Sequence, residues 1–170
     1  MMFFRRNKSD IIMRLDKINR KILSLLQDNA KITNQELAVK VNLSPSSCLN
    51  RVKKLEQEGI IGPYLGVVNL EKACRSVMAI LTVKLHDQST DGFQSFYQCA
   101  KQISEVVECY TVSGSFDLFL RVAAADMVRF NQIVDQLLNI LPGMVNLSSH
   151  IVLSTDKPFR GFALDTLLEH

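Results

Sequence analysis

Hydroxyl, amide and cationic side chains gather in one short stretch of the sequence, residues 42–59, NLSPSSCLNRVKKLEQEG. Ser44 followed by Pro45 is typical of a helix start, because a serine hydroxyl accepts from a free backbone N–H and proline has no N–H to satisfy. On a helix of about 100° per residue, Cys48, Val52 and Leu55 share one face. The opposite face holds Ser46, Ser47, Asn50, Lys53, Lys54 and Gln57, with Arg51 at its edge.

This polar face has the chemistry that duplex DNA requires. Hydroxyl and amide groups hydrogen-bond to base edges, and ammonium and guanidinium groups neutralise phosphates. A solvated surface helix also has a polar outer face, so the pattern alone leaves two interpretations. The charge distribution favours DNA, since residues 1–62 hold 12 Lys/Arg against 6 Asp/Glu and residues 63–170 hold 8 against 11. The predicted DNA-contacting residues are Ser44, Ser46, Ser47, Asn50, Arg51, Lys53 and Lys54.

The elements before this stretch predict a helix-turn-helix domain over residues 14–61. Apolar residues recur at helical spacing in residues 16–28. Thr33 with Glu36 three residues later forms a capping box and starts a second, short helix. Asn42 then begins a tight turn into the third helix, 45–58, which ends at Gly59. Residues 1–13 are an extension that we expect to be flexible.

After a linker at 62–75, the pattern changes and predicts a second domain over residues 76–156. Strand-like alternation and helical spacing follow each other in the order βαββαβ, and Gly114-Ser115 marks a hairpin between the two middle strands. This order is typical of the ferredoxin-like fold, so the fold class is α+β. The expected elements are strand 76–85, helix 90–103, strands 105–113 and 116–124, helix 126–141 and strand 145–153, followed by a C-terminal tail at 157–170.

Both faces of the predicted sheet carry apolar side chains. On the first strand, Leu81 and Val83 point to one face, while Met78 and Ile80 point to the other. Two helices cover only one face of a four-stranded sheet. The sequence therefore predicts a homodimer that buries the second face between two sheets.

Residues 15–61 resemble the helix-turn-helix domain of the Lrp/AsnC family of regulators. The segments VSGSFDLFLRV (112–122) and LPGMVN (141–146) are similar to the hairpin and the last helix-to-strand turn of that family's effector domain. The resemblance implies dimers that associate further into tetramers or octamers, with an amino-acid effector bound between dimers. The effector-binding residues that it implies are Ser113, Gly114, Asp117, Ser149 and His150. Without an effector, Gly114 and Asp117 still have a plain role in forming the turn.

Two other functions remain open from the sequence. Siroheme decarboxylases resemble the same two-domain arrangement, but His86 and His150 are the only histidines before the last residue. A nucleoid-organising protein would bind DNA with little sequence preference. We expect no catalytic residues, cofactor or metal, because catalytic motifs and CxxC spacings are lacking and the four cysteines read as buried reduced thiols. No apolar run has membrane-spanning length and no signal-peptide pattern occurs, so we expect a cytoplasmic protein.

Overall fold

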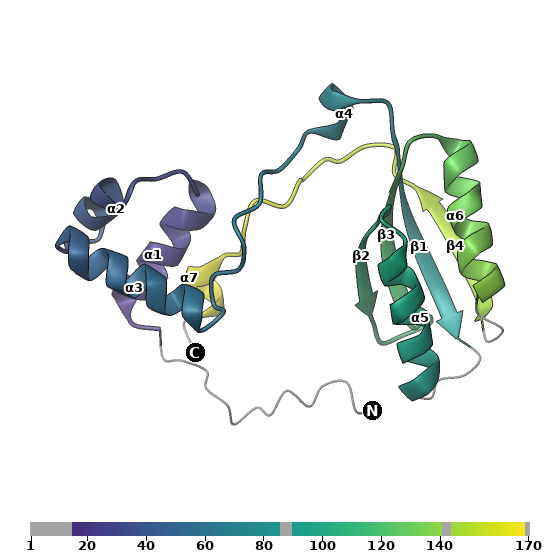
Figure 1. The fold of residues 1–170 in the computed structure, drawn as a ribbon, viewed down its shortest axis with the longest axis horizontal. Helices are drawn as coiled ribbons and strands as arrows, with labels where there is room; N and C mark the ends of the chain where they lie inside the picture. Colours follow the sequence, from purple (N-terminus) through teal and green to yellow (C-terminus); the bar gives the residue numbers. More distant parts are fainter. Residues whose placement is uncertain (1–14, 86–89, 141–143, 169–170) are drawn as a thin grey trace. The chain divides into compact units, whose positions relative to one another are not determined.

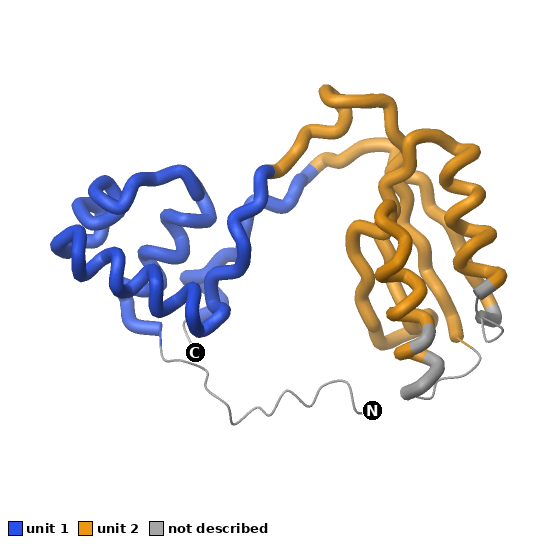
Figure 2. The backbone as a smooth tube through the Cα atoms, in the orientation of Figure 1, with its two compact units in different colours: residues 1–66, 157–170 blue, residues 67–156 orange. Residues whose placement is uncertain are grey.

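The computed structural model describes residues 15–85, 90–140 and 144–168. The chain folds into two compact units (Figure 2), one formed by residues 1–66 with 157–170 and the other by residues 67–156. The predicted extension at 1–13 lies outside the described residues, as does the 141–143 part of LPGMVN. The first unit is the predicted helix-turn-helix region together with the C-terminal tail.

Three helices form the core of the first unit: α1 (Lys17–Asp28), α2 (Asn34–Lys40) and α3 (Pro45–Gln57). They confirm the three helices expected from the sequence. Ile22, Cys48 and Leu55 are fully buried where the helices meet. The rest of this buried core is Leu23, Leu37, Ala38 and Val41.

Each of these helices begins at a residue whose side chain accepts a hydrogen bond from the first turn. Asp16 accepts from the N–H of Asn19 at the start of α1, and Ser44 accepts from the N–H of Ser47 at the start of α3. At the start of α2, Thr33 forms the predicted capping box with Glu36. Asn42 has a φ of 54°, a left-handed conformation that asparagine tolerates and that turns the chain between α2 and α3.

The linker contains a helix that the sequence analysis missed. Its one turn, α4 (Leu70–Ala73), begins at Asn69, whose side chain accepts from the N–H of Lys72. The signal was present, because asparagine is a favoured helix cap. A second short helix, α7 (Leu164–Leu167), lies in the segment predicted only as a tail.

The second unit has the predicted βαββαβ order: β1 (Val77–Leu85), α5 (Thr90–Gln102), β2 (Val106–Thr111), β3 (Leu118–Ala124), α6 (Met127–Ile140) and β4 (Met144–Ile151). The four strands form an antiparallel sheet in the order β2-β3-β1-β4, with α5 and α6 on one face (Figure 1). The predicted hairpin is confirmed, since β2 and β3 pair directly. None of the described helices is long and apolar enough to span a bilayer.

The two faces of the sheet differ in exposure, as the alternation of β1 predicts. Ala79, Leu81 and Val83 are fully buried with side chains of α5 and α6. Ile80 and Thr82 point to the other face and remain partly exposed. On that open face, Ile80 lies beside Arg121 and His150 in the strand register, and Thr82 lies beside Phe119 and Ser148.

The cysteines follow the prediction of buried thiols with one exception. Cys48 and Cys99 are buried, and Cys109 is partly buried. Burial raises the pKa of all three thiols. Cys74, which ends α4, is exposed, so the expectation of burial is wrong there because the linker around it has no core to enter.

Candidate DNA-binding face and ligand pocket

The exposed side of α3 carries the polar residues that the sequence singled out. Ser44, Ser46, Ser47, Asn50, Lys53 and Lys54 are all exposed, while Arg51 is half-buried. The apolar face of the same helix is closed, with Cys48 and Leu55 at zero exposure. The helix therefore presents hydroxyl, amide and ammonium groups to solvent from a fixed backbone.

The start of α3 is held in place by hydrogen bonds. The Ser44 hydroxyl accepts from the Ser47 N–H at 3.2 Å and donates to the Ser47 hydroxyl at 2.9 Å. The Asn34 side-chain amide donates to the carbonyl of Pro45 at 2.8 Å and so joins α2 to the first turn of α3. Ser44 is thus engaged as a cap, whereas Asn50 lies one to two turns further along on the exposed side.

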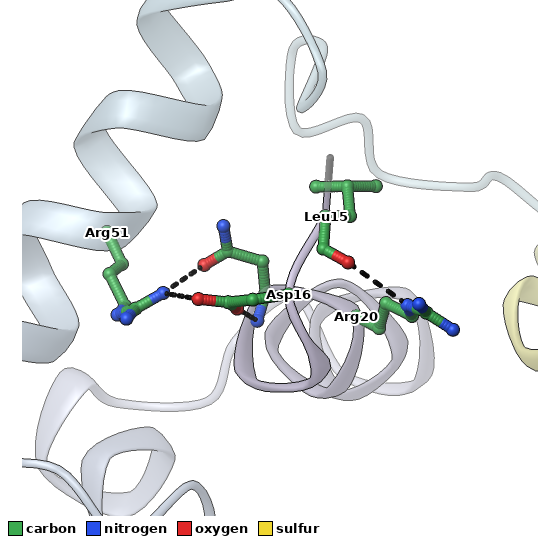
Figure 3. Close-up of polar contacts among 5 residues, drawn as sticks. Leu15, Asp16, Arg20 and Arg51 are labelled. Carbon is green, nitrogen blue, oxygen red and sulfur yellow. Dashed lines mark hydrogen bonds and ion pairs between the residues drawn. The ribbon is translucent and has the colours of Figure 1, made fainter. Parts of the chain in front are cut away.

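Arg51 points away from the exposed face and toward the beginning of α1 (Figure 3). Its Nη1 lies 2.6 Å from Asp16 Oδ2 and 2.9 Å from Asn19 Oδ1. The hydrogen bond from the Asn19 N–H, followed by the Arg51 guanidinium, holds the pKa of Asp16 below its ordinary value. This network ties α3 to α1. On the other side of α1, Arg20 Nε donates to the Leu15 carbonyl at 3.2 Å.

Sequence reasoning missed the role of Asn19. This side chain is only 7% exposed and lies between the apolar positions Ile18 and Ile22. A buried polar side chain needs a partner, and Arg51 supplies one. An amide inside an otherwise apolar helix stripe was the available signal.

The two lysines of α3 have few competing anions. Lys54 Nζ lies 3.9 Å from Glu58 Oε1, at the edge of ion-pair distance and largely exposed. For Lys53, no carboxylate lies within ion-pair distance among the residues that the structure describes. Both ammonium groups are therefore available to an external anion.

In the second unit, a pocket opens on the uncovered face of the sheet beside the turn between β2 and β3. Its volume is about 290 Å³. Thr82 and Ser148 lie opposite each other in the register, as do Lys84 and Asn146, so these four side chains share one face. Ser115 and Phe116 from the turn complete the lining.

Asp117 anchors this turn to β1. Its side chain is nearly buried, with Oδ1 accepting from Lys84 Nζ at 3.1 Å and Oδ2 accepting from the Leu85 N–H at 2.9 Å. Its backbone N–H also donates to the carbonyl of Val83 at 2.9 Å. Asp117, one of the predicted effector-binding residues, is thus already paired with the ammonium group of Lys84, a residue that the sequence analysis did not select.

The other predicted effector residues fall into two groups. Ser113 and Gly114 lie in the exposed turn next to Ser115, and Gly114 has a φ of 128°, where glycine is strongly favoured. Ser149 and His150 are successive residues of one strand, so their side chains point to opposite faces. His150 lies opposite Ile80 on the open face, the face of the pocket, whereas Ser149 lies opposite Leu81 on the helix side.

Comparison with known proteins matches both units. A family model described as winged helix-turn-helix DNA-binding matches residues 15–61, and one described as Lrp/AsnC ligand binding domain matches residues 78–162. The leucine-responsive regulatory protein of Haemophilus influenzae is 37% identical over 153 residues, covering 90% of this chain and 89% of that protein. Its counterpart in Escherichia coli K12 is 32% identical over 152 residues, covering 89% and 93%.

Solved structures give the same answer. A transcriptional regulator of Neisseria meningitidis, determined as a complex with L-Met, has a TM-score of 0.81 and 33% identity, covering 90% of this chain and 99% of that one. An AsnC family regulator of Agrobacterium tumefaciens has a TM-score of 0.81 and 26% identity, covering 89% and 99%. Fold and site together define a transcriptional regulator with a DNA-binding helix-turn-helix and a ligand-binding domain. The chain belongs to the Lrp/AsnC family.

The family and the α+β fold expected from the sequence are thereby confirmed, as is a role in transcription regulation. The relatives named above are regulators, and they give the siroheme decarboxylase alternative no support. Among the described residues, no group of three or more His, Cys, Asp or Glu side chains is arranged to hold a metal ion.

Proposed function

We propose that the protein regulates transcription by reading specific DNA sequences with the N-terminal half of α3. The observation that carries this proposal is the exposed row of hydroxyl, amide and ammonium groups on a helix whose start is fixed by a cap. Ser46, Ser47 and Asn50 contact base edges in the major groove, and Lys53 and Lys54 contact phosphates. Ser44 and Arg51 act indirectly, as the cap of α3 and its tie to α1.

The experiment that tests DNA reading is fluorescence anisotropy on a duplex from the promoter of the protein's own gene, with a scrambled duplex of equal length. We expect tighter binding to the promoter and a steep decrease of affinity with salt, because phosphate contacts release counterions. Equal affinity for both duplexes would contradict sequence-specific reading and favour the nucleoid-organising alternative. Absence of binding to either duplex would contradict the proposal altogether.

The pocket beside the β2–β3 turn is the proposed site of a small amino-acid effector. Its volume of about 290 Å³ is at the lower end of ligand pockets, which suits a molecule of few heavy atoms. Lys84 offers a cation for the effector's carboxylate, and the turn residues Ser113 and Gly114 offer backbone groups. The L-Met complex of the Neisseria relative supports this class of ligand. An effector's ammonium group competes with Lys84 for Asp117.

Of the last-strand residues, His150 shares the face of the pocket, so we assign it to the pocket's rim. Ser149 then acts only if a second copy brings a ligand to the helix side of the sheet. Lys84→Met tests the effector site: we expect loss of the amino-acid response with DNA affinity unchanged, measured by anisotropy with an amino-acid panel. An unchanged response would place the effector elsewhere. Lys101→Met, an exposed lysine of α5, is the matched control.

The part of the open face that β2 and β3 form, beyond the pocket, is the proposed dimer interface. It combines apolar side chains with a Glu108–Arg121 ion pair at 2.9 Å, and Tyr110 lies 6.0 Å from Phe119 between ring centres. Burial against a second sheet would remove this surface from water. We propose a homodimer that assembles further to a tetramer or octamer, and sedimentation velocity with Phe119→Asp tests it. A variant that keeps the wild-type mass would contradict this interface.

Because the proposed partner is double-stranded chromosomal DNA, we place the protein in the cytoplasm. We propose no cofactor and no catalytic activity, since the functions assigned to the named residues are contacts with DNA and with an effector. Titration with siroheme, followed by absorbance, tests the alternative; a stoichiometric spectral change would contradict this assignment.

A further inference from the structure

Two hydrogen bonds join the C-terminal segment, residues 157–168, to α1 within the first unit. The first unit is hereafter the DNA-binding unit and the second the ligand-binding unit. The N–H of Phe162 donates to Gln27 Oε1 at 2.8 Å, and Gln27 Nε2 donates to the carbonyl of Phe162 at 3.2 Å. Gln27 lies in α1, 135 positions earlier in the chain. One side-chain amide thus binds both backbone groups of a distant residue, because its oxygen accepts and its NH₂ group donates.

Packing and charge around this contact agree with a fitted segment. Leu164 packs against the buried core of the three helices, and the rings of Phe159 and Phe162 meet edge to face at 5.0 Å. Asp165 shares a pocket with Lys17, Arg20 and Lys21 of α1, so its negative charge faces a cationic surface.

The contact between Gln27 and Phe162 requires a glycine at position 161. Its φ is 117°, and a Cβ added there would lie 2.9 Å from Gln27 Oε1 and 3.2 Å from Gln27 Cβ. An alanine at this position would be strained by its backbone and would collide with the side chain that holds Phe162. A one-carbon change at Gly161 is therefore expected to release the segment.

We propose that residues 157–168 form a second tether, which binds α1 and restricts the rotation of the DNA-binding unit relative to the ligand-binding unit. The segment that binds α1 is the C-terminal segment of the same chain. The ligand-binding unit is inserted between two attachments, the linker that follows Ile61 and the segment that leaves β4 at Ile151. A unit held by one linker pivots freely, whereas a unit held by two has far fewer orientations. The proposal rests on the proposed reading of DNA.

Restricted orientation matters for a dimer on DNA. The two recognition helices of a dimer must reach two half-sites at once. Once the first helix is bound, the second binds at an effective concentration that rises as its range of orientations narrows. From Ile151, the ten residues before Phe162 extend at most about 40 Å, so docking of Phe162 limits where α1 can lie. Release of the segment therefore weakens binding to paired half-sites more than binding to one.

A designed cross-link tests the docking without DNA. In the Gln27→Cys/Gly161→Cys chain, the two Cβ atoms start 3.2 Å apart, slightly below the range of about 3.5–4.5 Å found in disulfides, so a small shift of the segment suffices. Mild oxidation is expected to give a disulfide within one chain, seen by mass spectrometry and by unchanged mobility on a non-reducing gel. Cross-linked dimers that also form when the exposed Cys74 is replaced by Ser would show that a second copy supplies the segment. Absence of a cross-link, together with hydrogen exchange of the Phe162 N–H in the wild-type chain as fast as in a free peptide, would overturn the docking.

DNA binding tests the tether. Gly161→Ala is measured by anisotropy on a promoter duplex with two half-sites and on the same duplex with one half-site scrambled, with Gly66→Ala as control because space around Gly66 is open. We expect a loss of about tenfold on paired half-sites and less than about twofold on one. Equal losses on both duplexes would show mere destabilisation and overturn the tether. If the wild-type chain binds neither duplex, the proposed function fails and the tether's role falls with it, while the cross-link still decides the docking.

Discussion

The two units are held in shape by different kinds of interaction. In the described residues, the ligand-binding unit buries fifteen apolar side chains around its sheet, whereas the DNA-binding unit buries seven. The smaller core is supplemented by polar contacts at helix ends, such as the Ser44 cap and the ion pair of Arg51 with Asp16. A small core fixes helix angles less firmly than a paired sheet fixes its strands. The orientation of α3 therefore depends on a few named polar side chains.

The largest expected effect is on the core of the smaller unit. Leu55→Ala removes a fully buried side chain of α3 and is expected to cost about 2–5 kcal/mol of unfolding free energy. Because the DNA-binding unit has its own core, its unfolding transition in urea shifts and that of the ligand-binding unit does not. Leu120→Ala in β3 should do the reverse. If both transitions move together in either variant, the units do not have independent cores.

The next prediction distinguishes the lysines of α3, whose ammonium groups are available to DNA, from Arg51, whose guanidinium is paired with Asp16. Replacing Lys53 and Lys54 together by Ala is expected to weaken binding to every DNA sequence by about 30-fold at moderate salt and to lower the salt slope by about two, since each phosphate contact contributes about 0.9. Anisotropy over a salt series measures both quantities. Lys101→Ala in the other unit should change neither, and an unaltered slope in the double variant would mean that these lysines face away from DNA.

Arg51 should behave differently from these lysines. Arg51→Met breaks the tie between α3 and α1 and is expected to reduce DNA affinity about fivefold, the equivalent of about 1 kcal/mol for a partly exposed ion pair. The salt slope should stay at the wild-type value, because Asp16 already neutralises this cation. Asp16→Asn is the matched variant on the other side of the pair and should give a similar loss. A lower slope in Arg51→Met alone would show direct contact with phosphate.

The smallest expected effect is on the pH dependence of the unfolding free energy, which should differ between the two units. Arg129 Nε lies 2.6 Å from Glu105 Oε1 in the ligand-binding unit and, with further hydrogen bonds, lowers the pKa of Glu105 to about 2. A carboxylate whose folded pKa is depressed stabilises the fold fully above its unfolded value of 4.5 and loses this effect as the pH falls toward about 2. In acid unfolding, Arg129→Met should flatten the pH dependence of the ligand-binding unit between these limits. The pKa of Asp16 is also lowered, so the DNA-binding unit should keep its own acid dependence.

Helix caps and tight turns, which join residues close in the chain, were predicted well from the sequence. The Thr33–Glu36 capping box and the Ser44 cap join groups three residues apart, and both are present in the structure. The Gly114 turn joins two adjacent strands and is likewise present. Such contacts close short loops at small entropic cost, so residue type and spacing suffice to predict them.

Contacts between distant residues were beyond this kind of prediction. The bond from Lys84 to Asp117 joins residues 33 positions apart, and it changes Asp117 from an open carboxylate into the anchor of a turn. Arg51 lay at the edge of the polar face on a helical wheel, where spacing leaves its direction undecided. Its partners, Asp16 and Asn19, belong to another helix. The register of β4 decided that Ser149 and His150 face opposite sides.

By itself, the sequence determined the family, the order of helices and strands, and the polar face of α3, because periodicity, caps and turns are encoded over a few residues. Only the tertiary structure decided which charged side chains are paired, where the candidate ligand pocket opens, and that the C-terminal segment lies on α1 beside Gln27. These features depend on packing that brings residues from remote parts of the chain together. Many pairings satisfy the same local pattern, and the buried core and strand register select one of them.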